Sequence, residues 1–246
     1  MTPALLSAAA RPPFVLRGRI LTPLRAGGTR FIEDGVVSVH AEGRIAGVFD
    51  ASSRPPAPDG APAIDLRPWL LLPGLVDLHA HLPQLANAGL GAGLDLLTWL
   101  ARYVFPLERS FDEAAASRLA PAAFRSFAAA GTTTVVLHGA VYEPSLDASF
   151  RAAEAHGIRA VIGKVMMDRI RYDETLPDAA VLETSLRQSA DLCARWHMRD
   201  EGRLRYAFTP RFAVSCSAAM LRESASLAAS NGAYWQTHLA EDRGEI

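Results

Sequence analysis

The sequence predicts an α/β protein: an incomplete (β/α)8 TIM-like barrel of about five β/α units that follows a small β-rich unit. After residue 73, apolar segments of strand length alternate with helical stretches, which is typical of a parallel sheet with helical crossovers. Histidine or arginine stands at the carboxyl end of four of these strands, where a barrel gathers its site residues. No GxGxxG motif follows the first of these strands, which argues against an open dinucleotide-binding sheet.

The first 72 residues are expected to form only strands and turns. Short apolar runs bounded by turn residues predict strands over 14–21, 35–40, 44–49, 63–66 and 70–72. Gly27-Gly28 and Glu42-Gly43 mark tight turns between them. Residues 52–62 are rich in proline and predict a surface loop.

Residues 73–246 are expected to contain five strands, each but the last followed by helix. The strands are predicted over 75–82, 132–138, 159–167, 204–209 and 234–239, and the helices over 95–105, 111–130, 146–156, 179–198 and 217–230. A closed barrel needs eight strands. We therefore expect this chain to be a fragment or a truncated product of a longer protein, and residues 1–246 alone to be unstable.

Composition excludes several classes of function. The chain has 246 residues, half of them hydrophobic and 21% charged, with a net charge of −1, which favours a globular protein and gives no reason to expect nucleic-acid or anionic-membrane binding. The two cysteines are far apart in sequence, which argues against a disulfide framework and favours a reduced, cytoplasmic setting. No apolar run approaches the length of a membrane span, and residues 1–14 lack the pattern of a signal peptide.

His79 and His81 are the first candidate metal ligands. They end the first strand after the Pro73-Gly74 pair, and side chains at positions i and i+2 of a strand point to the same face. Two imidazoles side by side suit two ligands of one zinc ion. The alternative, two unrelated histidines on an exposed strand, is disfavoured by the Pro-Gly pair and by Asp77.

His238 and Glu241 form a second candidate motif. His238 ends the fifth predicted strand, and Glu241 lies three residues later, in a loop at the expected mouth of the barrel. A hydrolytic zinc site needs histidine ligands, an open position for water and a carboxylate that moves protons. The two residues can serve as ligand and proton carrier; the alternative is a histidine at a strand end followed by a solvated glutamate.

These motifs together resemble the amidohydrolase superfamily, in its deaminase branch. Finer matches resemble the guanine deaminase family: HLPQ at residues 81–84, GKVMMD at 163–168 and TPRFAVSCS at 209–217. The matches run in order from about residue 71 to residue 245. The resemblance implies a (β/α)8 barrel, of which residues 73–246 would be the first part, and a small β-sandwich, of which residues 1–72 would be the N-terminal share.

The resemblance also implies roles for single residues. The ligands of one zinc ion per subunit would be His79, His81 and His238, and Glu241 would be the catalytic proton carrier. Lys164 does not lie on the fourth strand, where some relatives carry a carboxylated lysine between two metal ions, so a single-metal site is expected. The residues that contact the substrate would be His81, Gln84, Arg211, Phe212, His238 and Glu241. For His138 a pocket-lining role and a structural role are equally plausible interpretations.

The implied function is the zinc-dependent hydrolytic deamination of guanine to xanthine and ammonia, a step of purine catabolism. The implied enzyme is a cytoplasmic hydrolase that acts on carbon–nitrogen bonds and is a homodimer when full length. The family also has a histidine after strand six and an aspartate after strand eight, which residues 1–246 do not reach, so we expect this chain alone to be inactive. Two alternatives remain open: a related amidohydrolase for another purine, a pterin or a triazine ring, and an inactive fragment or pseudoenzyme that acts as a binding module.

Overall fold

The structure is a computed structural model that describes residues 11–53 and 60–243. The expectations for residues 1–10 and for most of the proline-rich loop lie outside this range. Contacts divide the chain into two compact units, Met1–Pro73 and Gly74–Ile246. Among the described residues, no helix combines the length and hydrophobicity needed to cross a bilayer.

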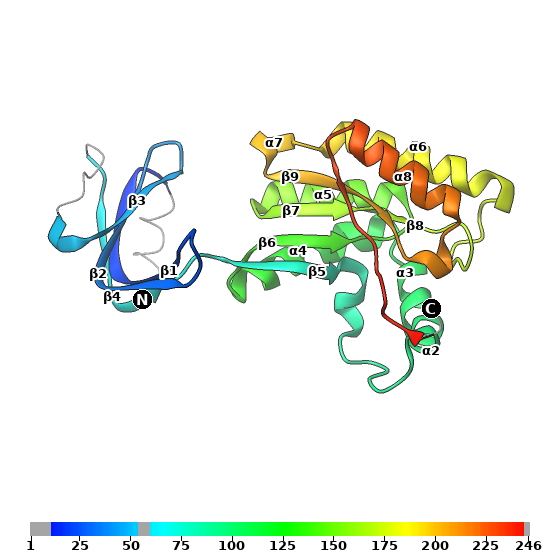
Figure 1. Cartoon of the computed structure of the whole chain (residues 1–246), viewed down its shortest axis with the longest axis horizontal. Coiled ribbons are helices and arrows are strands. Elements are labelled where there is room, and N and C mark those ends of the chain that lie inside the picture. The colour runs from blue at the N-terminus through cyan, green and yellow to red at the C-terminus, as the bar shows by residue number, and fades with distance from the viewer. Residues whose placement is uncertain (1–10, 54–59, 244–246) are drawn as a thin grey trace. The chain divides into compact units, whose positions relative to one another are not determined.

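The first unit is a four-stranded sheet, coloured blue to cyan in Figure 1. Its strands lie in the order β3-β2-β1-β4 and are β1 (Phe14–Pro23), β2 (Thr29–Val39), β3 (Ile45–Asp50) and β4 (Ala63–Leu71), with a 3-10 turn, η1 (Ala51–Ser53), after β3. β4 is one strand where the pattern predicted two, because a register irregularity opposite Gly18 accommodates its proline-containing middle. Apolar side chains of β1, β2 and β3 line an open groove of about 370 Å³ together with Leu71 and Leu72.

The second unit is built on a parallel sheet, which confirms the predicted α/β class. Its main strands lie in the order β10-β9-β7-β6-β5, and the short β8 pairs with β9. They are β5 (Leu75–His81), β6 (Thr132–His138), β7 (Arg159–Gly163), β8 (Val165–Met166), β9 (Leu204–Pro210) and β10 (Tyr234–Trp235). All pairs are parallel, so the carboxyl ends of the strands meet at one edge of the sheet.

Helices connect the strands. They are α2 (Leu96–Trp99), the π-helix η3 (Leu100–Val104), α3 (Phe105–Arg109), α4 (Glu113–Ala129), α5 (Glu143–His156), α6 (Asp178–Trp196), α7 (Arg199–Gly202) and α8 (Ala218–Ser230), with 3-10 turns η2 (Leu82–Asn87) and η4 (Ala213–Ser215). Local sequence sets the ends of these helices. The Asp112 side chain caps α4 by accepting a hydrogen bond from the Ala115 N–H, and the Ser217 side chain caps α8 by accepting one from the Met220 N–H. Gly157 ends α5 with a left-handed φ of 86°. In Figure 1, α6 and α8 lie side by side along the sheet.

The core of this unit lies between the sheet and its helices. Leu137 of β6, Ile162 of β7 and Phe208 of β9 are fully buried there against Phe124 of α4 and Phe150 of α5. Burying side chains of this size contributes about 1.5–3 kcal/mol each.

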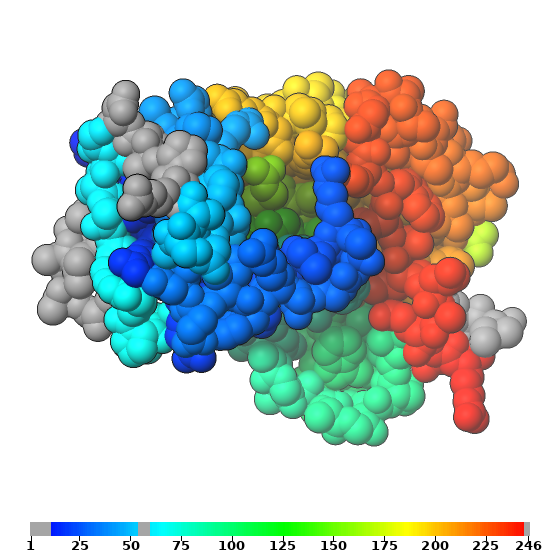
Figure 2. All heavy atoms as spheres, turned by 60° about the vertical axis from the view of Figure 1, so that its left-hand side comes forward, coloured from blue at the N-terminus to red at the C-terminus, as the bar shows by residue number. Residues whose placement is uncertain are grey.

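Both edge strands of the sheet carry exposed apolar side chains. On β5, Leu75, Val76 and Leu78 are more than half exposed, and beyond β10 Leu239 is 80% exposed. The segment from η2 to α2 extends away from β5 and β6 in the ribbon of Figure 1, and it belongs to the green lobe of Figure 2.

Candidate metal and substrate site

Four histidines meet at the carboxyl edge of the parallel sheet. The ligand atoms of His79, His81, His138 and His238 all lie within 4.8 Å of one another. The rings of His81, His138 and His238 form a triangle, with the centroid of His81 4.5 Å from that of His138 and 5.0 Å from that of His238, and with those of His138 and His238 4.4 Å apart. The ends of β5 and β6 and the segment after β10 therefore bring together residues that are far apart in sequence.

An irregularity in β5 sets the position of His79. Between Asp77 and Ala80 the register against β6 shifts, so β5 carries an extra residue there. The Asp77 carboxylate accepts a hydrogen bond of 3.0 Å from the His79 N–H and holds this turn of the backbone. His79 is exposed but still lies 5.1 Å from His81, ring centroid to ring centroid.

His238 is fixed by one carbonyl group. The Arg211 oxygen accepts from the His238 backbone N–H at 2.9 Å and from ring Nδ1 at 2.7 Å. Because a carbonyl only accepts, Nδ1 carries the proton and Nε2 presents a lone pair to the cluster. The predicted strand over 234–239 shortens to β10, yet His238 keeps its place through these two bonds.

The cluster fits a metal ion. Nε2 of His81 and Nε2 of His238 are 2.9 Å apart, and within the described part of the chain both ring nitrogens of His138 and Nδ1 of His81 are buried without a hydrogen-bond partner. Burial lowers the pKa of His81 to about 4 and also lowers the pKa values of His138 and His238, so the rings are neutral at pH 7. Neutral, converging imidazoles are the donor set that zinc and similar ions prefer.

A buried carboxylate, Glu108, organises the residues beside the histidines. Its Oε1 accepts from Gln84 Nε2 at 2.7 Å, and its Oε2 accepts from Arg211 Nη1 at 2.6 Å. Oε1 also lies 3.8 Å from Nδ1 of His81. Burial alone raises the pKa of Glu108, but the charge of Arg211 and the hydrogen bonds outweigh it and lower that pKa to about 2. Glu108 is therefore ionised and holds Gln84 and Arg211 in place.

The π-helix η3 explains why Glu108 reaches this position. The Phe105 N–H bonds to the Leu100 carbonyl five residues back, and this wider turn lets the helical segment continue through Pro106, which has no N–H to donate. Leu100, Val104 and Glu108 are all buried. The segment was predicted to end at Phe105, so the sequence pattern placed Glu108 outside the helix.

A cavity of about 310 Å³ lies beside the histidines. His79, His81, His238, Gln84, Arg211, Phe212 and Glu241 line it, together with Trp99 and Leu100. Phe212 is 3% exposed and packs on Leu100 and Val104, while Glu241 lies on the exposed rim. The lining thus combines a flat apolar wall with a few fixed polar groups, as a site for a small planar molecule requires.

Seven of the residues that line this cavity were predicted from the sequence as metal ligands or substrate contacts: His79, His81, Gln84, Arg211, Phe212, His238 and Glu241. Reasoning from the sequence missed Glu108 and left His138 open. A signal for Glu108 exists: Leu100 and Val104 precede it by eight and four residues, at the spacing of one helix face.

Comparison with known proteins gives consistent matches. The model of the amidohydrolase family matches residues 70–246. The guanine deaminase of Escherichia coli K12 is 38% identical over 224 residues, which cover 90% of this chain and 49% of that protein.

Two solved structures agree in fold. The structure of Escherichia coli guanine deaminase is 35% identical with a TM-score of 0.84, and the match covers 95% of this chain and 55% of that one. Guanine deaminase from C. acetobutylicum, crystallised with guanine in its active site, is 28% identical with a TM-score of 0.83, and the match covers 95% of this chain and 54% of that one. The chain spans about half the length of the curated relatives it matches.

Proposed function

The chain belongs to the amidohydrolase family, and on that premise we propose that its protein is a zinc-dependent enzyme that hydrolyses guanine to xanthine and ammonia. The observation that carries the proposal is the cavity lined by three histidines of the four-histidine cluster and by Gln84 and Arg211, the pair that Glu108 holds in place. The likeness to proteins named guanine deaminase supports guanine as the substrate.

We also propose that the parallel sheet is part of a (β/α)8 barrel and that the first unit is one share of a β-sandwich. The apolar side chains exposed on β5 and after β10 would become buried if further strands packed beside these two edges of the sheet. The open apolar groove on the four-stranded sheet supports a second sheet in the same way. The proposed domains are residues 1–72 and 73–246.

His79, His81 and His238 would hold the zinc ion. When bound, an ion of this kind supplies a Lewis acid that makes water reactive at neutral pH. His138 stacks on His81 and stays neutral, so it adds no competing positive charge next to the ion. The Arg211 carbonyl orients the lone pair of His238, which is a common support for a histidine ligand.

The remaining residues bind the base and move protons. Glu108 uses one amide hydrogen of Gln84, which leaves the Gln84 carbonyl oxygen and the other hydrogen for the edge of a purine. Arg211 keeps donors free for a ring carbonyl, and Phe212 offers a flat apolar face. Glu241 takes one proton from the water as the water adds to the amino-bearing ring carbon, and it passes that proton to the adjacent ring nitrogen. The remaining hydroxyl proton then moves to the amino group, which leaves as ammonia while the ring carbonyl forms.

An assay of the protein expressed from its complete reading frame tests this proposal. Guanine should yield xanthine and ammonia in equal amounts, with turnover that is lost on chelation and restored by zinc. Glu241→Gln should lower kcat by about 10²- to 10⁴-fold while zinc content stays unchanged. Faster turnover of adenine, a pterin or a triazine than of guanine would show that guanine is not the preferred substrate. Zinc-loaded protein that turns over none of these rings would show that the proposed deaminase function is wrong.

A further inference from the structure

The only lysine of the chain, Lys164, is buried. The chain has 25 basic side chains, of which 24 are arginine, so arginine provides every other fixed cation. Lys164 lies between β7 and β8, is 2% exposed, and donates one hydrogen bond of 3.0 Å from Nζ to Ser185 Oγ on α6. An ammonium group has three donors, so this contact leaves two for another partner.

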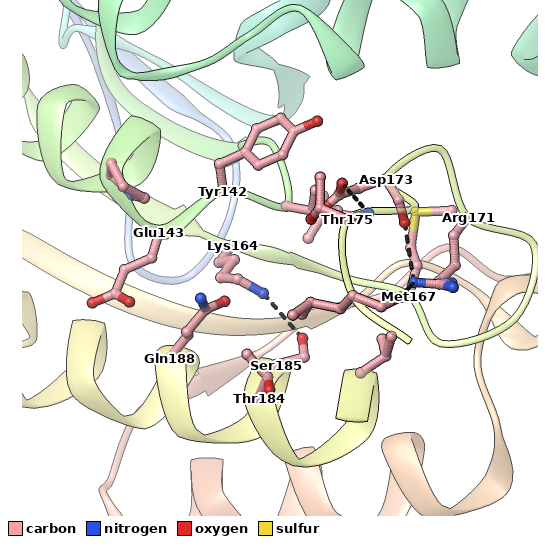
Figure 3. Close-up of a pocket in the computed structure, with 15 residues that line it drawn as sticks. Tyr142, Glu143, Lys164, Met167, Arg171, Asp173, Thr175, Thr184, Ser185 and Gln188 are labelled. Atoms are coloured by element: carbon pink, nitrogen blue, oxygen red, sulfur yellow. Dashed lines mark hydrogen bonds between the residues drawn. The ribbon is translucent and has the colours of Figure 1, made fainter. Parts of the chain in front are cut away.

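A cavity of about 200 Å³ surrounds this side chain. Figure 3 shows Lys164 pointing at Ser185, with Glu143 on one side and Arg171 and Asp173 on the other. Val141, Val165, Met167, Leu176 and Val181 supply an apolar part of the wall. None of the residues that line this cavity lines the cavity beside the histidines.

The other charged residues around the cavity have partners of their own. Glu143 accepts from Arg195 at 3.2 Å, and Asp173 accepts from the backbone and hydroxyl of Thr175. Arg171 pairs with Asp178 at 2.5 Å and donates to two backbone carbonyls.

The only hydrogen-bond partner of the Lys164 amine among the described residues is the neutral hydroxyl of Ser185. In the part of the chain that the structure describes, no carboxylate lies within ion-pair distance of its amine. Burial lowers the pKa of Lys164 to about 8, although the charges of Glu143 and Asp173 oppose this shift. A buried ammonium without a counter-charge is unfavourable, and an anion in the cavity would relieve it.

We propose that this cavity is a second ligand site, which binds a small organic monocarboxylate through the Lys164 amine. The carboxylate would accept the two remaining Nζ donors, and a short hydrocarbon body would lie on the apolar wall. Glu143 and Asp173 face the same space and would repel a second negative charge, so dianions such as sulfate and phosphate are disfavoured. The proposal does not depend on guanine deamination.

Selective labelling tests the site without any substitution. Lys164 is the only side-chain amine within residues 1–246, and peptide mass spectrometry follows its acetylation by an amine-reactive reagent separately from that of the α-amine. For butyrate we expect a dissociation constant on the order of 1 mM, reasonable for a ligand of this size. At about ten times that concentration the acetylation of Lys164 should slow about tenfold, while that of the α-amine stays unchanged.

Two variants provide an independent measurement. Butyrate should raise the Tm of the wild-type protein but not that of Lys164→Met, which keeps most of the side-chain volume and removes the amine. Arg187→Met is the matched control, because it removes a cation from the exposed face of α6, and it should keep the butyrate shift.

Three outcomes would overturn the proposal: no protection of Lys164 by butyrate, equal protection by sulfate, or an undiminished Tm shift in Lys164→Met. If Lys164→Met does not fold, the labelling result decides. If native Lys164 does not react with the reagent, the comparison of Tm shifts decides.

Discussion

Breaking the buried contact between Glu108 and Arg211 should destabilise the second unit by about 3–5 kcal/mol. The two side chains are 0% and 3% exposed, and Oε2 lies 2.6 Å from Nη1. Glu108→Gln puts an amide NH2 against a donor of either Gln84 or Arg211, and it leaves the guanidinium without its counter-charge. Arg211→Met leaves the carboxylate buried alone and should cost a similar amount.

A double-mutant cycle isolates the interaction. The double variant Glu108→Gln/Arg211→Met should be less destabilised than the sum of the single variants, with a coupling of at least about 2 kcal/mol. Urea unfolding followed by circular dichroism gives the four free energies of unfolding, those of the wild type, the two single variants and the double variant.

The surface pair Arg199–Glu154 is the matched control. It lies in the same unit at 2.5 Å, but its side chains are 50% and 34% exposed. Solvent screens such a pair, so its coupling should be about 1 kcal/mol or less. Equal coupling for the two pairs would refute the argument that burial sets the strength of the Glu108 contact.

Three further predictions concern single residues. His238→Ala should lose bound zinc by elemental analysis, whereas the exposed His40→Ala should retain it; zinc retained by both would remove His238 from the ligand set. The pKa of Lys164 is about 8 in the folded chain, below its ordinary 10.5, so the unfolded chain binds more protons between these values. The free energy of unfolding of the wild type, measured relative to Lys164→Met, should therefore rise by up to about 3 kcal/mol from pH 8 to 10.5, and a flat difference would contradict the burial argument. Gly163→Ala should lower stability by at least about 1–3 kcal/mol in urea unfolding, because a Cβ there would overlap the Thr209 side chain; an unchanged midpoint would show that β9 gives way freely.

Local chemistry made much of the site predictable. The two-residue period of a strand pairs His79 with His81. His238 was predicted at the end of the fifth strand, but it lies three residues beyond β10 and is held by the Arg211 carbonyl. The alternation of strands and helices likewise predicted the parallel sheet. These features depend on residues that are close together in the sequence, so the sequence alone can predict them.

Long-range register was not predictable in the same way. His138 joins the cluster because it pairs with His81 across β5 and β6, and that register depends on the irregularity after Asp77. Glu108 was missed because a proline two residues earlier normally ends a helix, and a glutamate in a loop is normally solvated. Its burial follows from the packing of η3 and from the charge of Arg211, neither of which a local pattern contains.

The separation between His81 and His238 also has a consequence for synthesis. Their ring nitrogens are 2.9 Å apart, yet the two residues are separated by 157 positions in the chain. At the usual rate of translation, the ribosome needs roughly 8 to 30 s to make that stretch. A nascent chain therefore presents the first two imidazoles long before the third exists, so the proposed three-histidine site can be completed only after β6, β7 and β9 have been made.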